Sequence, residues 1–307
     1  MSSSLFTPEQ LFSFRYGCTH YIPGVPSSYG YIPTLGIGVT FDVLFGLSLL
    51  IHLRYGIKYR EITSALLATG ALGEALGWAA RTWSSKCPYS RDAFLMQTTS
   101  LIIAPTFFTA AAYVILGRLI ILTGAQSSYF RPRTYVITFV ICDLISLIVQ
   151  AVGGSIASRE SNKMNGNTKP GTNIMVAGIV FQMASMSAFV GVLIDYMIRC
   201  NRTLGNNLST TQFRVIMAMI FSVIAVYIRS VYRTVELLQG WEGYLITHER
   251  FFIGFDAALM CFAVGIYHTP SVNFQVLQAR SLDISPPSTG NRQDGVEQTE
   301  TKGLQGS

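Results

Sequence analysis

Residues 215–238 read VIMAMIFSVIAVYIRSVYRTVELL, a stretch long and apolar enough to cross a lipid bilayer as one helix. Arg229, Arg233 and Glu236 interrupt its second half. Their spacing of four and three residues places them on one helix face, with Tyr232 beside it. A charged face of this kind cannot point at lipid, so it must point at other helices. The stretch therefore predicts a helical membrane bundle with a polar interior.

The composition of the whole chain also indicates a membrane protein. Of 307 residues, half are hydrophobic and only 12 % are charged, which is about half the usual share in a soluble domain. Apolar runs of membrane-spanning length occur at seven places. We therefore predict an all-α integral membrane bundle of seven transmembrane helices, at 31–53, 62–80, 94–117, 135–157, 174–198, 215–238 and 251–267.

Basic residues set the predicted orientation of the bundle. Arg54, Lys58 and Arg60 directly follow the first apolar stretch, and such clusters stay on the cytosolic side of a membrane. The N-terminus is then outside and, after seven spans, the C-terminus is cytosolic. The formal net charge of +6 suits basic loops beside an anionic leaflet better than nucleic-acid binding.

We expect three parts along the chain: an extracellular N-terminal segment at 1–30, the seven-helix transmembrane domain at 31–270, and a cytosolic, largely disordered tail at 271–307. The tail is rich in Ser, Gly, Gln and Pro, a composition that does not build a packed core. Cys18 and Cys87 both lie outside in this arrangement, where disulfides form, so we predict that they pair.

Few ionisable side chains lie within the predicted spans, and each needs a physical explanation, because a charge at the bilayer centre costs roughly 2.5–3.5 kcal/mol on insertion scales. The spacing of Glu74, Gly77 and Arg81 puts these three on one side of the second span. We infer an interior polar chamber that opens toward the outer leaflet and is lined by the second, fourth, sixth and seventh spans. Its candidate substrate-binding residues are Glu74, Arg81, Asp143, Gln150, Arg229, Tyr232, Arg233, Glu236 and Asp256.

Three further features concern the packing of the helices. Pro105 removes a backbone donor from the third span and predicts a kink, whose freed carbonyl is satisfied within the bundle. Trp78, near the outer end of the second span, is expected at the membrane interface. Close helix contacts are expected at small residues that recur every four positions, namely Ala65, Thr69, Gly73 and Gly77.

Several enzyme mechanisms lack the residues that they require. The chain has no Gly-x-x-x-x-Gly-Lys-Ser/Thr loop for phosphates and no Gly-x-Ser-x-Gly elbow for a serine nucleophile. Its four histidines are assigned two to each side of the membrane, so they do not form a zinc centre. We therefore expect that the protein is no enzyme and holds no cofactor and no metal.

The buried polar pattern resembles that of the fungal lipid-translocating exporters, also called RTA-like or "resistance to aminocholesterol" proteins. Five motifs in order along the chain carry the resemblance: Glu74-Ala-Leu-Gly77-Trp78-Ala-Ala-Arg81; Ala104-Pro105 with Tyr113 and Gly117-Arg118; Asp143 with Gln150 and Gly153-Gly154; Arg229-Ser-Val-Tyr232-Arg233-Thr-Val-Glu236 with Gly240; and Glu249, Phe255-Asp256 and His268-Thr-Pro270. The resemblance implies a seven-helix protein of the plasma membrane or a related membrane. Its relatives are linked to export of sphingoid long-chain bases, to resistance to toxic amphiphiles and, in one branch, to porphyrin uptake.

We therefore predict a transporter that translocates or exports amphiphilic lipids and confers resistance to toxic amphiphiles. Its expected partners are membrane lipids or amphiphilic small molecules, not nucleic acid, and its oligomeric state stays open. Glu74, Glu236 and Asp256 are the carboxylates that we expect to receive a sphingoid ammonium group, while Arg229 and Arg233 tune them or bind a phosphate or carboxylate instead. One alternative is a seven-helix lipid receptor that signals through its cytosolic loops and tail. Another is that the buried charges form a closed ion-pair network that only fixes helix packing.

Overall fold

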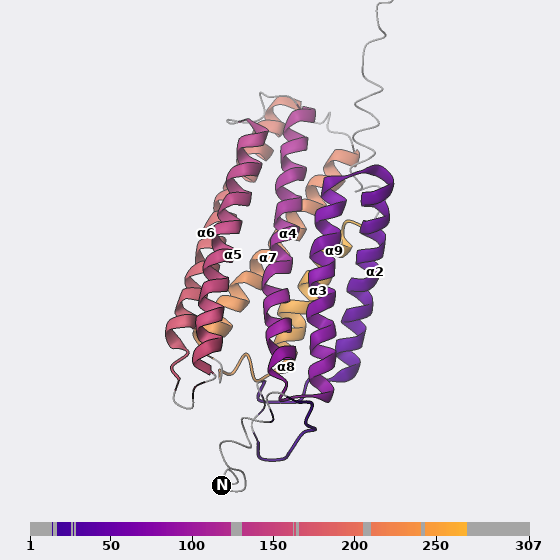
Figure 1. Cartoon of the computed structure of the whole chain (residues 1–307). Coiled ribbons are helices and arrows are strands. Elements are labelled where there is room, and N and C mark those ends of the chain that lie inside the picture. Colours follow the sequence, from indigo (N-terminus) through magenta and orange to yellow (C-terminus); the bar gives the residue numbers. More distant parts are fainter. Residues whose placement is uncertain are drawn as a thin grey trace, which may run out of the picture.

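The structure is a computed structural model, and it describes residues 14, 17–25, 27, 29–123, 131–161, 163, 166–204, 210–240 and 243–268. All regular secondary structure in these residues is helical, so the all-α prediction is confirmed for the described part of the chain. Figure 1 shows the long helices running side by side as one bundle. The predicted tail at 271–307 lies outside the described residues.

The helices follow the order and the approximate positions of the seven predicted apolar stretches. The last stretch is a continuous helical segment in three parts, and its middle part, η4, is a π-helix. The bounds are α2 Leu35–Tyr59, α3 Ile62–Lys86, α4 Arg91–Thr123, α5 Pro132–Ser161, α6 Lys169–Leu204, α7 Thr210–Leu238, α8 Glu249–Phe252, η4 Ile253–Ala258 and α9 Leu259–Gly265.

Five of these helices are long and apolar enough to cross a membrane: α2, α4, α5, α6 and α7. The two other predicted spans are not both long and apolar enough to meet this requirement, for different reasons. α3 is rich in Gly, Ala and Ser and carries Glu74 and Arg81, while the last segment is divided by η4 into pieces that are each too short. Both nevertheless run alongside the other helices in Figure 1. The count of seven spans therefore stays a prediction.

A disulfide joins Cys18 to Cys87, the two cysteines predicted to pair. We call this end of the bundle, where the N-terminal segment meets the end of α3, the disulfide end. The Tyr89 hydroxyl lies 3.1 Å from the Ile22 carbonyl oxygen and 3.2 Å from that of Val25. The N-terminal segment is thus held against the bundle by polar contacts as well as by the covalent link.

Small residues bring α3 and α4 close together. A Cβ atom added at Gly73 would lie 2.9 Å from the Ala104 Cβ, and one added at Gly77 would lie 2.5 Å from a methyl carbon of Leu101. The first member of the predicted small-residue stripe, Ala65, approaches α2 instead: a Cβ atom added at Gly56 would lie 3.4 Å from the Ala65 amide nitrogen. Thr69 is exposed. The prediction of close helix contacts is therefore confirmed at Ala65, Gly73 and Gly77.

Trp78 does not lie at the membrane interface, contrary to the prediction. Its side chain is fully buried, with ring centroids 4.7 Å from Phe41 and 5.6 Å from Phe252. Trp78 is one helical turn from Glu74 and lies on the same face of α3, which explains the result. The face that carries the buried charges also buries the indole.

The first and last described helices are neighbours, because α9 packs against both α2 and α7. At the end opposite to the disulfide end, the ring centroid of His52 in α2 lies 5.1 Å from that of His268, which follows α9. The helices therefore close into a ring instead of forming an open row.

We expect Gly171→Ala to destabilise the protein, because the backbones of α5 and α6 are in near contact there. The new Cβ would lie 2.3 Å from the Ala157 amide nitrogen and 2.7 Å from the Gly153 carbonyl oxygen. Overpacking of this kind costs about 1–3 kcal/mol, to be measured by thermal unfolding in detergent. Gly191→Ala, also in α6 but with nothing within 4 Å, is the matched control. Equal unfolding temperatures for both variants would contradict the close packing.

Candidate substrate-binding site

The charged face of α7 is buried, as its spacing predicts. Arg229, Arg233 and Glu236 expose only 4 %, 8 % and 2 % of their surface. Arg233 Nη1 donates to Glu236 Oε2 at 2.6 Å, and the Tyr232 hydroxyl donates to the other carboxylate oxygen at 3.3 Å. One helix thus supplies two cations, one anion and a hydroxyl to the interior of the bundle.

Asp256 brings a second acid to this face. It lies in the π-helix η4 and is fully buried. Its Oδ1 lies 2.6 Å from Arg229 Nε, although the two groups are not aligned as a hydrogen bond. π-Helical turns are rare and frequently occur at functional sites, where they re-aim a side chain. Here the wider turn carries the acid that faces α7.

Pro105 explains the position of Arg229. As a proline within α4, Pro105 has no N–H to donate to the carbonyl of Leu101, four residues earlier. Arg229 Nη2 donates a short hydrogen bond to that same carbonyl oxygen. The prediction that the freed carbonyl is satisfied within the bundle is confirmed, and the donor comes from another helix.

Glu74 is the acid of the cluster without a well-formed contact. It is fully buried, and neither of its carboxylate oxygens has a hydrogen-bond partner among the described residues. The Trp78 indole is close enough to interact with it but lacks the alignment of a hydrogen bond. Glu74 also interacts electrostatically with Arg229 and Asp256. The cluster therefore holds Glu74 near a cation without giving it a direct ion pair.

Arg81 belongs to a separate group at the disulfide end. Its Nη2 donates to Glu249 Oε1 at 2.8 Å and to the Tyr31 hydroxyl at 2.7 Å. The Glu249 carboxylate also accepts hydrogen bonds from the backbone N–H and the hydroxyl of Thr34, the N-cap residue of α2, at 3.0 and 2.7 Å. We call Arg81, Glu249 and Thr34 the outer latch, since they connect α3, α8 and the start of α2.

Electrostatic interactions within the outer latch favour the ionised form of Glu249. Burial on its own would raise the pKa of Glu249, but the hydrogen bonds from Thr34 and Arg81 outweigh burial and hold this pKa below its ordinary value. Nearby, burial raises the pKa of Tyr29 to about 12. The Tyr29 hydroxyl donates to Gln97 Oε1 at 2.9 Å, so it stays a neutral donor.

Asp143 is outside the ion cluster, contrary to the prediction of one chamber, whereas Gln150 lines a cavity together with Arg229 and Arg233. Asp143 Oδ2 accepts a hydrogen bond from Thr109 of α4 at 3.0 Å. The Gln150 amide donates to Ser146 at 2.9 Å and to Gln182 of α6 at 3.1 Å. α5 therefore adds no charge to the cluster. α4, which was not expected to line the chamber, contributes the Leu101 carbonyl.

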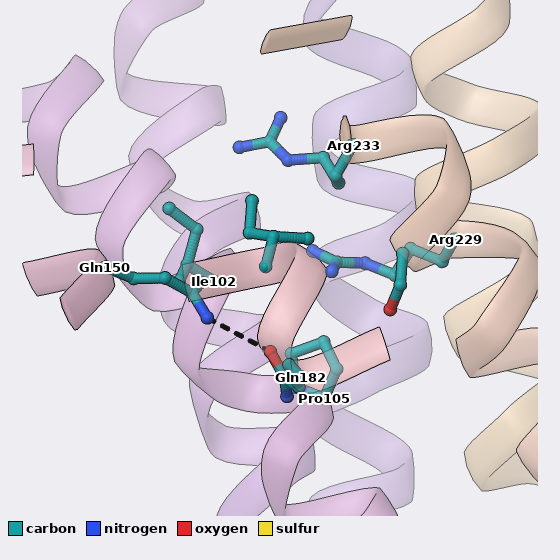
Figure 2. Close-up of a pocket in the computed structure, with 8 residues that line it drawn as sticks. Ile102, Pro105, Gln150, Gln182, Arg229 and Arg233 are labelled. Carbon is teal, nitrogen blue, oxygen red and sulfur yellow. Dashed lines mark hydrogen bonds between the residues drawn. The ribbon is translucent and has the colours of Figure 1, made fainter. Parts of the chain in front are cut away.

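A small cavity of about 20 Å³ lies where α4, α5, α6 and α7 meet, with room for about one water molecule. Figure 2 shows Arg229 and Arg233 extending into this space from α7, with Gln150 and Gln182 hydrogen-bonded to each other across it. A wider hollow of about 680 Å³ lies beside the outer latch, lined in part by Tyr31, Tyr244, His248 and Phe251. Polar groups thus face two spaces, one inside the bundle and one at its end.

Three groups that contribute to the site are absent from the set of residues predicted from the sequence. Glu249 lies two residues before the seventh predicted stretch, and its place in the family motif was the available signal. Gln182 is an amide within the otherwise apolar run at 174–198, a signal that was present but not used. The Leu101 carbonyl follows from the proline at 105, but only a three-dimensional structure identifies its donor.

Comparison with known proteins adds independent information. The model of one family, described as RTA1 like protein, matches residues 67–277, which include the whole ion cluster. The chain is 30 % identical to the sphingoid long-chain base transporter RSB1 of Saccharomyces cerevisiae, over 87 % of this chain and 80 % of the relative. It is 30 % identical to protoporphyrin uptake protein 1 of the same yeast, over 68 % and 72 %, and 27 % identical to protein RTA1, over 78 % and 83 %. No solved structure matches the chain.

We expect Arg229→Met to destabilise the protein by about 3–5 kcal/mol, because it leaves Asp256 buried without a counter-charge. The double variant Arg229→Met/Asp256→Leu is expected to lose clearly less than the sum of the two single losses. Denaturation in detergent of the wild type, both single variants and the double variant measures this coupling. Strictly additive losses would show that the two side chains do not form a pair.

The contacts of Glu249 in the outer latch determine how we expect the stability of the protein to depend on pH. Since the folded pKa of Glu249 is lowered, the carboxylate contributes stability above the ordinary glutamate pKa of 4.5, and this contribution is lost as the pH falls through the lowered value. Glu249→Gln removes the contribution. We expect the unfolding temperatures of wild type and variant to differ at pH 7 and to converge once the pH falls below the lowered pKa of Glu249. A difference that stays constant down to pH 3 would contradict the assignment.

Proposed function

The chain belongs to the RTA1-like family of membrane proteins, and from this we propose that it translocates or exports amphiphilic lipids, with sphingoid long-chain bases or similar molecules as substrates. It is a multi-pass membrane protein. We further propose seven spans, an N-terminus outside the cell, a cytosolic C-terminus and a location in the plasma membrane. In this orientation the disulfide end and the outer latch face outward.

The observation that carries the proposal is the buried carboxylate of Glu74. A buried acid without a direct partner is costly unless another group satisfies it. Arg229 and Arg233 each have a close acid, whereas Glu74 forms no direct ion pair among the described residues and has the Trp78 indole nearby. An ammonium group on an entering lipid would supply the missing ion pair. This asymmetry favours a binding chamber over a closed ion-pair network.

The route to Glu74 is proposed to pass the outer latch. Arg81 is two helical turns from Glu74 on the same helix, and it contacts Glu249 at the disulfide end. The hollow beside the latch is lined by aromatic side chains of the kind that occur at lipid–water interfaces. An amphiphile can lie there with its chain in the lipid and its head group directed at the bundle.

We expect Glu74→Gln to reduce the rate of sphingoid-base movement at least tenfold, which corresponds to about 1.4 kcal/mol of lost stabilisation. The measurement is the movement of a labelled long-chain base across vesicles that contain the full purified chain. Glu160→Gln is the matched control, since Glu160 pairs with Lys163 on the surface. Wild-type rates for Glu74→Gln, in protein that unfolds normally, would refute the role of this carboxylate.

A further inference from the structure

The cavity between α4, α5, α6 and α7 differs in chemistry from the ion cluster beside it. Its polar wall consists mainly of Arg229, Arg233, Gln150 and Gln182. The acids of the cluster, including Glu74 and Asp256, are not among the residues that line it. The two sides of the arginines are therefore unlike: acids on one side, and a cavity of guanidinium and amide groups on the other.

The arginines retain donors after their internal contacts are counted. A guanidinium group carries five N–H donors. In Arg233, Nη1 bonds to Glu236, while the buried Nε has no partner among the described residues. Arg229 reaches Asp256 and the Leu101 carbonyl with Nε and Nη2. Both arginines line the same cavity as the two glutamines, and Figure 2 shows the two arginine side chains extending from α7.

An ammonium group does not fit this wall, because the two guanidinium cations would repel it and no carboxylate of the described residues lines the cavity. A phosphate fits, since its oxygens accept several hydrogen bonds and two guanidinium groups bind it with matching charge and geometry. Ile102 and Ile179 complete the wall, so the surroundings also accept an alkyl chain. The cavity of about 20 Å³ has room for about one water molecule, so the helices must separate to admit such a head group.

We propose that this cavity binds the phosphate monoester head group of a single-chain amphiphile. The inference rests on the proposed function in one respect, namely that amphiphile head groups enter the bundle. It adds a second substrate class, anionic instead of cationic, and a second place of recognition. Glu74 contacts the ammonium class, and the wall of Arg233, Gln150 and Gln182 contacts the phosphate class.

The test is a thermal shift of the full purified chain in neutral detergent, with dodecyl phosphate, inorganic phosphate or dodecylamine added at equal concentrations. We expect dodecyl phosphate to raise the unfolding temperature and inorganic phosphate alone to have little effect. Arg233→Gln is expected to abolish the shift. Gln182→Leu, which keeps every charge, is expected to weaken the affinity for dodecyl phosphate at least fivefold. Gln212→Leu, near the other end of α7, is the matched control and should respond like the wild type.

Two results would overturn the inference. One is a dodecyl phosphate shift that survives both Arg233→Gln and Gln182→Leu, which would place the ligand elsewhere. The other is an equal shift with inorganic phosphate, which would identify a free anion instead of a lipid. Failure of the proposed function is a separate outcome. In that case dodecylamine raises the unfolding temperature of Glu74→Gln as much as that of the wild type. If Arg233→Gln does not fold, Gln182→Leu decides the question.

Discussion

The bundle depends on one backbone carbonyl that has lost its own helical partner. Pro105 frees the oxygen of Leu101 in an environment without water, and such a group must find another donor. Arg229 provides that donor and carries a positive charge into the interior, where Asp256 compensates it. A single proline thus leads to a link between α4, α7 and the π-helix η4. The polar interior is a consequence of this link as much as of any ligand.

The same arginines divide the interior into two chemically different sides. Toward α3 and η4 they face carboxylates, and one of these, Glu74, has no direct partner among the described residues. Toward α5 and α6 they face amides and a small cavity. A protein that handles amphiphiles of opposite charge needs such a division, because a cationic and an anionic head group cannot be stabilised by the same surface.

Local spacing predicted the part of the site that lies on single helices. The interval between Arg229, Arg233 and Glu236 predicted one buried face, and the structure agrees. Spacing could not predict partners between helices, because it contains no information on which faces meet. The prediction of one chamber therefore included Arg81 and Asp143, which form their contacts elsewhere, whereas Gln150 does lie at the cavity beside Arg229 and Arg233. The π-helix was also beyond prediction, since sequence periodicity assumes 3.6 residues per turn.

The position of Glu249 has a mechanical consequence. Its carboxylate accepts hydrogen bonds from Thr34 at the start of α2, 215 positions earlier in the chain, and the ring of His52, in the second half of the same helix, lies beside that of His268. The first described helix is thus joined to the last helical segment by contacts in both of its halves. These contacts oppose a separation of α2 from the last helical segment, so we expect any widening of the bundle on the opposite side. That side, between α4 and α6, is where the cavity lies.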